Sequence, residues 1–308
     1  MNNVEKIIDD IKALKVQGAT NVAKACLEGV KLFADTYEGM NFDEFLNELK
    51  VIAWKLASSR PTEPLARNLI RYVLSNIDGN TIEEVRDVQL EDLIMSAYQM
   101  LENAKIEIVK SGVEIMSNVD AILTHCHSST ANNIIVGVHD RVASLKVYAT
   151  ETRPLFQGRT TAKRLIEAGI DTTMLVDSAS SMFIISHNQP DVDAIIIGCD
   201  EITRDGSAIN KIGSLDISLA AKYAGKPLYV ATSLLKLDLS AEDFEPVIEL
   251  RDAHEVWEDA PDGLEIANPA FEKVPHSLIT GFITEVGVVV PQEVLIRAKD
   301  NYPWMKGY

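Results

Sequence analysis

Three segments of the sequence carry side chains that can move protons or hold an anion. Residues 124–134 read THCHSSTANNI and follow the apolar run VDAIL, while Asp200 ends the run DAIIIGCD. Lys211 lies inside GSAINKIGS at 206–214. A thiol or carboxyl group at the end of a buried strand is suited to proton transfer, and a lysine there is suited to binding an anion.

Cys126 has several interpretations. A lone cysteine is most often an inert buried thiol. His125 and His127 could join it around a metal, but in an extended segment these two point the same way while Cys126 points to the opposite side, so the sequence predicts no metal site. At the N-terminus of a helix and near cations, the pKa of the thiol would fall below about 8.5, and Cys126 would act as a base or nucleophile.

The hydroxyl residues Ser128, Ser129 and Thr130 stand where a helix is expected to begin. They could simply cap that helix. Free amide groups and the helix dipole at the same place also favour an anion. The basic residues Lys211 and Lys236, each near the end of a later apolar run, favour a bound phosphate.

Asp200 follows six apolar or small residues, so its carboxyl group enters a crevice from the core side. A carboxyl group removed from water favours its protonated form and can act as an acid. A strand-end aspartate that caps a turn is the alternative. Cys199 faces the opposite side of the strand and is expected to pack in the core.

Two segments, one around Lys211 and one around Arg60, offer further side chains that could bind an anion. Asn210 and Lys211 lie between glycines, which is also typical of a surface turn. Arg60 lies in the proline-flanked stretch SSRPTEP, and arginine suits bidentate binding of phosphate, although most arginines are solvated.

The elements that must position these groups fall into two domains. Residues 1–115 show apolar residues at helical spacing and are expected to form a helical domain, while 116–308 alternate short apolar runs with helical stretches. That alternation predicts an α/β, Rossmann-like domain with a parallel sheet, whose ligands lie beyond the carboxyl ends of the strands. Strands are expected at 119–125, 145–150, 172–177, 192–200, 227–232 and 278–284. No GxGxxG motif follows the first strand, so no dinucleotide cofactor is expected.

Composition narrows the class of protein. The chain has 308 residues and a formal charge of −17, which argues against nucleic-acid binding but not against an anionic small substrate. Three widely spaced cysteines do not suggest a disulfide framework. The N-terminus does not resemble a signal peptide, and no apolar stretch is long enough to span a membrane. A soluble, cytoplasmic protein without membrane partners is expected.

Several segments together resemble one superfamily. In order along the chain they are THCHSSTA, VYATETRPLFQGRTTAKRL, LVDSASSMFI, IIIGCDEITRDGSAINKIGS and NPAFEKVPHSLIT. The superfamily contains ribose-1,5-bisphosphate isomerases, 5-methylthioribose-1-phosphate isomerases and the alpha, beta and delta subunits of translation initiation factor 2B. The resemblance covers nearly the whole chain. HCHSS in the first segment favours the archaeal ribose-1,5-bisphosphate isomerases.

The resemblance implies roles for individual residues. Cys126 would accept a proton and Asp200 would donate one. The residues implied to contact substrate are Ser128, Ser129, Thr130, Asn210, Lys211, Lys236 and Arg60. An Arg-Gly-Ala-Gly-like loop near the N-terminus reads Gln17-Gly18-Ala19-Thr20 here, so the family's arginine is missing and Thr20 adds a side chain. One phosphate contact is therefore in doubt, unless a base such as Lys24 replaces it.

The function implied is isomerisation of ribose 1,5-bisphosphate to ribulose 1,5-bisphosphate in the catabolism of adenosine monophosphate and nucleosides, without a cofactor. Members of this branch form dimer-based homo-oligomers, often hexamers, and are activated by adenosine monophosphate. Two alternatives stay open. One is a non-catalytic regulatory subunit that binds an initiation factor, and the other is a 5-methylthioribose-1-phosphate isomerase.

Overall fold

The computed structural model describes residues 2–186, 191–239 and 248–305, and the chain divides into two compact units. The first unit contains Met1–Asn103, Leu235–Ser240 and Ala298–Tyr308, and the second contains Ala104–Leu234 and Ala241–Arg297. These units differ from the predicted division into 1–115 and 116–308. One long helix runs through the boundary, and two later segments join the helical unit. Neither feature is visible in a sequence whose helical period continues unbroken to residue 115.

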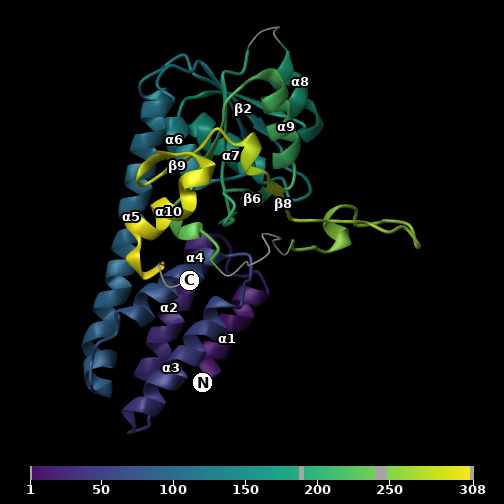
Figure 1. Ribbon diagram of the computed structural model, residues 1–308. Coiled ribbons are helices and arrows are strands. Elements are labelled where there is room, and N and C mark those ends of the chain that lie inside the picture. The colour runs from purple at the N-terminus through teal and green to yellow at the C-terminus, as the bar shows by residue number, and fades with distance from the viewer. Residues whose placement is uncertain (1, 187–190, 240–247, 306–308) are drawn as a thin grey trace. The chain divides into compact units, whose positions relative to one another are not determined.

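The first unit is built from amphipathic helices (Figure 1). Apolar residues at helical spacing turn inward, as Val4, Ile8 and Ile11 do in the first helix, where each is at most 3% exposed. Asn41 caps the third helix by accepting from the amides of Asp43 and Glu44. The helices are α1 (Asn2–Lys12), α2 (Ala19–Asp35), α3 (Phe42–Ala57), α4 (Pro64–Ser75) and α5 (Leu90–Ile115), with a π-helical turn at Glu84–Gln89.

The second unit contains a seven-stranded sheet in the order β10-β9-β7-β4-β1-β2-β3. All neighbours are parallel except β10, which pairs antiparallel with β9. The six predicted strands are confirmed. The strands are β1 (Ala121–His125), β2 (Lys146–Thr150), β3 (Asp171–Leu175), β4 (Ala194–Ile197), β7 (Leu228–Ala231), β9 (Gly281–Thr284) and β10 (Gly287–Val289).

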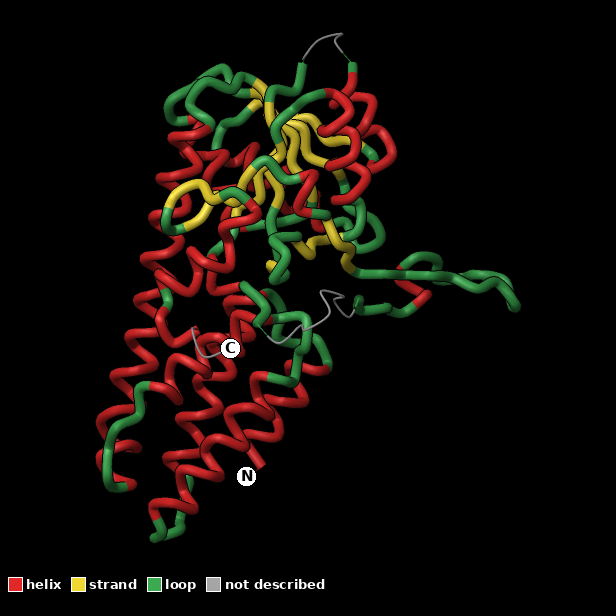
Figure 2. Tube along the Cα trace, viewed as in Figure 1, coloured by secondary structure: helices red, strands yellow, loops and turns green. Residues whose placement is uncertain are grey.

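Helices between the strands complete a mixed α/β fold (Figure 2). The central strands β1 and β4 are buried along their whole length, as their nearly continuous apolar sequences require. Their residues share a core with α6 and the end of α5. The helices of this unit are α6 (Ser129–His139), α7 (Gln157–Glu167), α8 (Ser180–Ile185), α9 (Ser214–Ala224) and α10 (Val294–Asn301), the last of which continues into the first unit.

A small antiparallel sheet, in the order β5-β6-β8, was not predicted. It consists of β5 (Glu201–Ile202), β6 (Ala208–Lys211) and β8 (Phe271–Val274). Asn210 and Lys211 therefore lie on a buried strand, 4% and 7% exposed, and their interpretation as a surface turn is wrong. Residues 248–270, which precede β8 and are called the arm below, extend away from the sheet (Figures 1 and 2).

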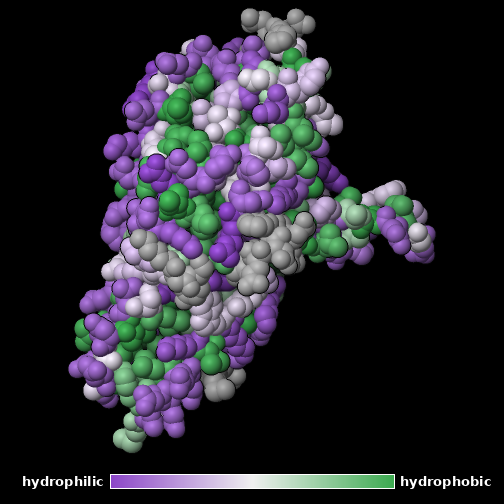
Figure 3. Space-filling view, viewed as in Figure 1, coloured by the Kyte–Doolittle hydropathy of each residue, from purple (hydrophilic) through white to green (hydrophobic). Residues whose placement is uncertain are grey.

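The face of the molecule in Figure 3 is largely hydrophilic, in keeping with the acidic composition. Apolar side chains nevertheless gather over α8 and α9, where Met182, Leu219 and Tyr223 are 62%, 51% and 80% exposed. Among the described residues, no helix combines the length and the apolar character needed to cross a bilayer.

Asp205, in the turn between β5 and β6, provides a prediction about stability in acid. Burial raises its pKa, but hydrogen bonds from Thr203, Lys273 and Ser207 outweigh that effect and lower the pKa from 3.8 to about 2. A carboxylate with a lowered folded-state pKa stabilises the protein above pH 4 and loses that contribution as the pH falls toward 2. In Asp205→Asn, the free energy of unfolding should therefore depend less steeply on pH between 4 and 2. Urea unfolding at a series of pH values measures this, and an unchanged slope would contradict it.

Candidate active site

Cys126 and Asp200 follow neighbouring strands of the large sheet. β1 pairs in parallel with β4, with His125 beside Ile197, so Cys126 and the turn that carries Asp200 leave the same edge. The charge of Asp200 acts on the Cys126 thiol and on Lys211. The backbone amide of Asp200 donates to the Ile209 carbonyl at 2.9 Å, which ties this turn to β6.

The backbone around Cys126 is held in an unusual conformation. Cys126 has a φ of 65° and Thr152 a φ of 62°, both in the left-handed region that costs non-glycine residues free energy. The Cys126 amide donates to Thr152 Oγ1 at 3.0 Å, and Thr161 Oγ1 donates to the Cys126 carbonyl at 2.8 Å. Asp177 accepts from the Thr152 amide at 2.7 Å. Side chains from the ends of two strands, β2 and β3, and from α7 thus fix the backbone that carries the thiol.

The predicted lowering of the thiol pKa is wrong. Burial raises the pKa of Cys126 to about 11. Lys211 and a backbone hydrogen bond from His127 oppose that rise, while Asp200 and Asp177 add to it. A helix N-terminus and a lysine therefore do not offset the loss of water, which the sequence could not reveal because it does not report depth of burial.

Lys211 is placed on β6 with its ammonium group 4.4 Å from the centroid of the Phe271 ring. Burial lowers the pKa of Lys211 below its usual value, and the negative charges of Cys126 and Asp200 oppose that effect only in part. Asn210, on the same strand, donates to Ser214 Oγ at 2.8 Å. A buried ammonium group beside a thiol and a carboxyl group is well placed to hold an anion.

Ser128, at the start of α6, is the N-cap, and its Oγ accepts from the Ala131 amide at 3.2 Å. It also lies against the β4 end, because a Cβ at Gly198 would come within 2.7 Å of Ser128 Cβ and 3.8 Å of Asn210 Oδ1. Ser129 and Thr130 occupy the first turn of the helix. Capping thus accounts for the Ser128 hydroxyl and leaves the other two hydroxyls for a ligand.

Because Ser128 caps α6 and Ser129 does not, replacing each with alanine should change the free energy of unfolding by different amounts. Ser128→Ala should lower the free energy of unfolding by about 0.5–2 kcal/mol, because the Ala131 amide loses its acceptor. Ser129→Ala, in the exposed first turn, should change it by less than about 0.5 kcal/mol. Chemical denaturation of both variants measures the difference, and equal losses would mean that capping does not distinguish them.

Other predicted substrate contacts belong to the first unit. Arg60 is 7% exposed, so the solvated alternative is wrong, and its Nε lies 3.8 Å from Glu63 Oε1. The carbonyls on either side of Lys236 accept from Asn68 Nδ2 at 2.7 and 2.8 Å. The predicted loop at Gln17–Thr20 is only partly a loop, because Ala19 and Thr20 begin α2. Gly18 is the N-cap with a φ of 83°, and the Gln17 side chain donates to the Leu14 carbonyl.

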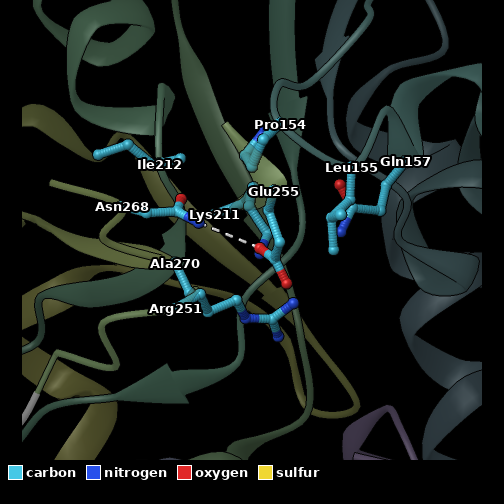
Figure 4. Close-up of a pocket in the computed structure, with 9 residues that line it drawn as sticks. All are labelled: Pro154, Leu155, Gln157, Lys211, Ile212, Arg251, Glu255, Asn268 and Ala270. Atoms are coloured by element: carbon cyan, nitrogen blue, oxygen red, sulfur yellow. Dashed lines mark hydrogen bonds between the residues drawn. The ribbon is translucent and has the colours of Figure 1, made fainter. Parts of the chain in front are cut away.

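A small hollow beside Lys211 includes residues that the sequence did not single out (Figure 4). It has about 190 Å³ of space, its open mouth included, and Arg251, Glu255 and Asn268 of the arm form one wall. Asn268 Nδ2 donates to Glu255 Oε2 at 3.1 Å. The opposite wall comes from the loop before α7. Their distance in sequence from Lys211 hid these residues, since contacts of the folded chain such as the β6–β8 pairing bring the arm to the site.

The histidines on either side of Cys126 make other contacts. His125 bonds with Thr150 and the Ile212 carbonyl, and His127 Nδ1 lies 3.1 Å from Thr161 Oγ1. In the described part of the chain, no group of three or more His, Cys, Asp or Glu side chains is arranged to hold a metal ion.

Comparison with known proteins decides the family. The sequence profile of the initiation factor 2 subunit family matches residues 15–291. The chain belongs to this family. Among its members, ribose 1,5-bisphosphate isomerases from Methanocaldococcus jannaschii and Archaeoglobus fulgidus are 33% and 36% identical to this chain, covering 99% and 96% of it and 97% and 92% of their own lengths.

Other relatives carry different names. A methylthioribose-1-phosphate isomerase from Desulforamulus reducens is 33% identical over 91% of this chain and 85% of its own. The crystal structure of translation initiation factor eIF-2B from Pyrococcus horikoshii has a TM-score of 0.79 and 26% identity, covering 96% of this chain and 99% of that one. The predicted fold class and family resemblance are thereby confirmed.

Proposed function

We propose that this protein isomerises ribose 1,5-bisphosphate to ribulose 1,5-bisphosphate, with Cys126 as base and Asp200 as acid. The observation that carries the proposal is a thiol and a carboxyl group at adjacent strand ends, with the charge of Lys211 acting on both. Relatives named as sugar-phosphate isomerases support it, since their similarity extends over nearly the whole chain.

The substrate requires such a pair because its anomeric oxygen carries a phosphate. That phosphate prevents the ring opening by which a free aldose reaches its carbonyl form. The ring must instead open between C1 and the ring oxygen, while the phosphate ester at C1 stays intact. An acid is needed at the ring oxygen and a base at C2, and each contributes roughly 10²–10⁴-fold to the rate.

The proposed proton path returns both groups to their starting states. The Cys126 thiolate takes the C2 proton, the electron pair forms a C1–C2 double bond, and the C1–ring oxygen bond breaks as Asp200 protonates that oxygen. The product of this step is a phosphoenol. Its C2 hydroxyl then gives its proton to Asp200 while the Cys126 thiol protonates C1, which yields the ketone and restores thiolate and carboxylic acid.

The raised thiol pKa makes the reactive pair, a thiolate with a carboxylic acid, the less populated form of the site. A thiol with a carboxylate and a thiolate with a carboxylic acid carry the same total charge and the same number of protons. The reactive form therefore needs a proton to pass from Cys126 to Asp200, and no uptake from solvent. Lys211 favours the thiolate, because its positive charge opposes the effect of burial on Cys126.

Phosphate binding is proposed for two sets of residues. In the second unit, Ser129 and Thr130 at the N-terminus of α6, together with Ser128, Asn210 and Lys211, provide hydroxyl, amide and ammonium donors. From the family resemblance we assign substrate contacts in the first unit as well, and these are Arg60, Lys236, Gln17, Gly18, Ala19 and Thr20.

A direct assay tests the proposal. Purified protein is incubated with ribose 1,5-bisphosphate or with 5-methylthioribose 1-phosphate, with and without adenosine monophosphate, and phosphorus NMR follows the product. Ribulose 1,5-bisphosphate formation that adenosine monophosphate accelerates is the expected result. Preferred turnover of the methylthioribose ester, which the relative from D. reducens keeps as the second candidate, would overturn the substrate assignment.

Assembly and location complete the proposal. We propose a cytoplasmic homo-oligomer, built from dimers and reaching a hexamer. The three free cysteines suit a reducing compartment, and the exposed apolar residues over α8 and α9 suit a contact between subunits. If the protein binds initiation factor 2 tightly and turns over neither sugar phosphate, the regulatory alternative replaces this function.

A further inference from the structure

His125 ends β1 immediately before Cys126, and only 2% of its surface is exposed. Its Nδ1 lies 2.6 Å from Thr150 Oγ1, and its Nε2 lies 2.8 Å from the Ile212 carbonyl oxygen. A carbonyl oxygen only accepts hydrogen bonds, so Nε2 carries a proton. Burial lowers the pKa of His125, so the ring is neutral and Nδ1 accepts the proton of the Thr150 hydroxyl.

These two hydrogen bonds connect the segments that carry the reactive groups. Thr150 ends β2, two residues before Thr152, whose hydroxyl holds the Cys126 amide. Ile212 directly follows Lys211 at the end of β6. One imidazole ring thus links the strand end that presents the thiol to the segment that presents the ammonium group.

The turn after Lys211 is packed closely on that ring. Gly213 has a φ of 102°, and a Cβ at this position would lie 2.9 Å from His125 Cε1 and 3.1 Å from Nε2. No side chain fits there unless the ring or the turn moves. The distance between the end of β1 and the turn at Gly213 is therefore set by direct contact of the His125 ring with the Gly213 backbone.

We propose that His125 is a positioning residue, which fixes Lys211 beside Cys126 and exchanges no proton with the substrate. The charged groups that act on the thiol are Lys211, Asp200 and Asp177, together with a backbone bond from His127. Lys211 is the cation among them, and His125 is bonded to the residue next to it. The inference deepens the proposed function, on which the roles of thiol and ammonium group rest.

A double-mutant cycle on thiol reactivity tests the inference. Iodoacetamide alkylates the thiolate, and mass spectrometry of the peptide that contains Cys126 separates its rate from those of Cys26 and Cys199. Lys211→Met should slow alkylation at pH 8 about tenfold in the parent protein, which corresponds to a thiol pKa about one unit higher. In the His125→Asn background, where the shorter amide does not reach Ile212, the same change should slow it less than about twofold.

His125→Gln provides the matched control. Its amide nitrogen reaches further than that of asparagine and can donate to Ile212, so the tenfold effect of Lys211→Met should return in this background. Comparing ratios within each background removes any general change in access to the thiol. If Lys211→Met slows alkylation equally in the His125→Asn background, His125 does not position Lys211 and the inference fails.

Two further measurements keep the result interpretable. If circular dichroism shows that His125→Asn is unfolded, Thr150→Val removes the donor to Nδ1 with little change of volume, and it should also reduce the effect of Lys211→Met. Alkylation needs no substrate. If the protein isomerises ribose 1,5-bisphosphate but the effect of Lys211→Met does not depend on His125, only the role of His125 is overturned. If that effect does depend on His125 but ribose 1,5-bisphosphate is not turned over, only the proposed function is overturned.

Discussion

A Cys126→Ser variant is expected to isomerise ribose 1,5-bisphosphate roughly 10²–10⁴-fold more slowly than the parent protein. Serine preserves the size of the side chain but replaces the thiol with a hydroxyl group, which is a far weaker acid. Its conjugate base is not populated even with Lys211 nearby, so the C2 proton has no acceptor. The loss should fall on kcat, with KM little changed, because substrate contacts are retained.

Cys26→Ser is the matched control for this prediction. Cys26 is fully buried in α2, and its thiol donates to the Leu56 carbonyl at 3.4 Å, a bond that a serine hydroxyl can replace. The same chemical change is thus made outside the proposed site, and turnover should stay within about twofold of the parent value. Steady-state kinetics on both variants, after thermal unfolding has shown both to be folded, make the comparison. Full activity in Cys126→Ser would remove Cys126 from the role of base.

An Asp200→Asn variant is expected to show a second loss of roughly 10²–10⁴-fold in kcat. The amide has nearly the same shape as the carboxyl group and keeps its capacity for hydrogen bonding. It cannot supply an acidic proton to the ring oxygen, so the C1–ring oxygen bond would have to break without protonation. The deuterium isotope effect of substrate labelled at C2 should change as well, because ring opening and proton removal are no longer balanced.

Asp205→Asn is the matched control, since Asp205 lies in the turn of the same β5–β6 hairpin. Its carboxylate bonds with Lys273 at 2.9 Å and with the Ser207 amide at 3.0 Å, contacts that hold the turn together. Turnover at pH 7.5 should stay close to the parent value in this variant, whereas its stability in acid changes as described above. If Asp200→Asn retains normal turnover, the proton donor must be sought elsewhere in the site.

The sequence predicted the large sheet well, for a physical reason. Each central strand is buried on both faces, so it is a short, mostly apolar run, as in AILTH and AIII. Such runs stand out between amphipathic helices. In such folds the residues just beyond the carboxyl ends of the strands meet at one edge, which is why the sequence could also point to the residues around the site.

The small sheet and the character of the thiol could not be predicted in the same way. β5 and β6 have two and four residues, too few to show a period, and β8 comes only after the long arm. The sequence predicted a lowered pKa for the Cys126 thiol, because it places the thiol at the start of a helix and near cationic groups. Its surroundings exclude enough water to reverse that expectation, and depth of burial is a property of the folded chain.

The pairing of β6 with β8 also affects when the proposed site can assemble during synthesis. Lys211 pairs with Phe271, about sixty residues later, and its ammonium group rests on that ring. A nascent chain that has emerged only as far as β7 already contains Cys126, Asp200 and Lys211, but the strand that completes the small sheet is still missing. Contacts between such distant residues form late, because a long loop must close first. Newly made chains would therefore hold the proposed site incomplete until β8 has been synthesised.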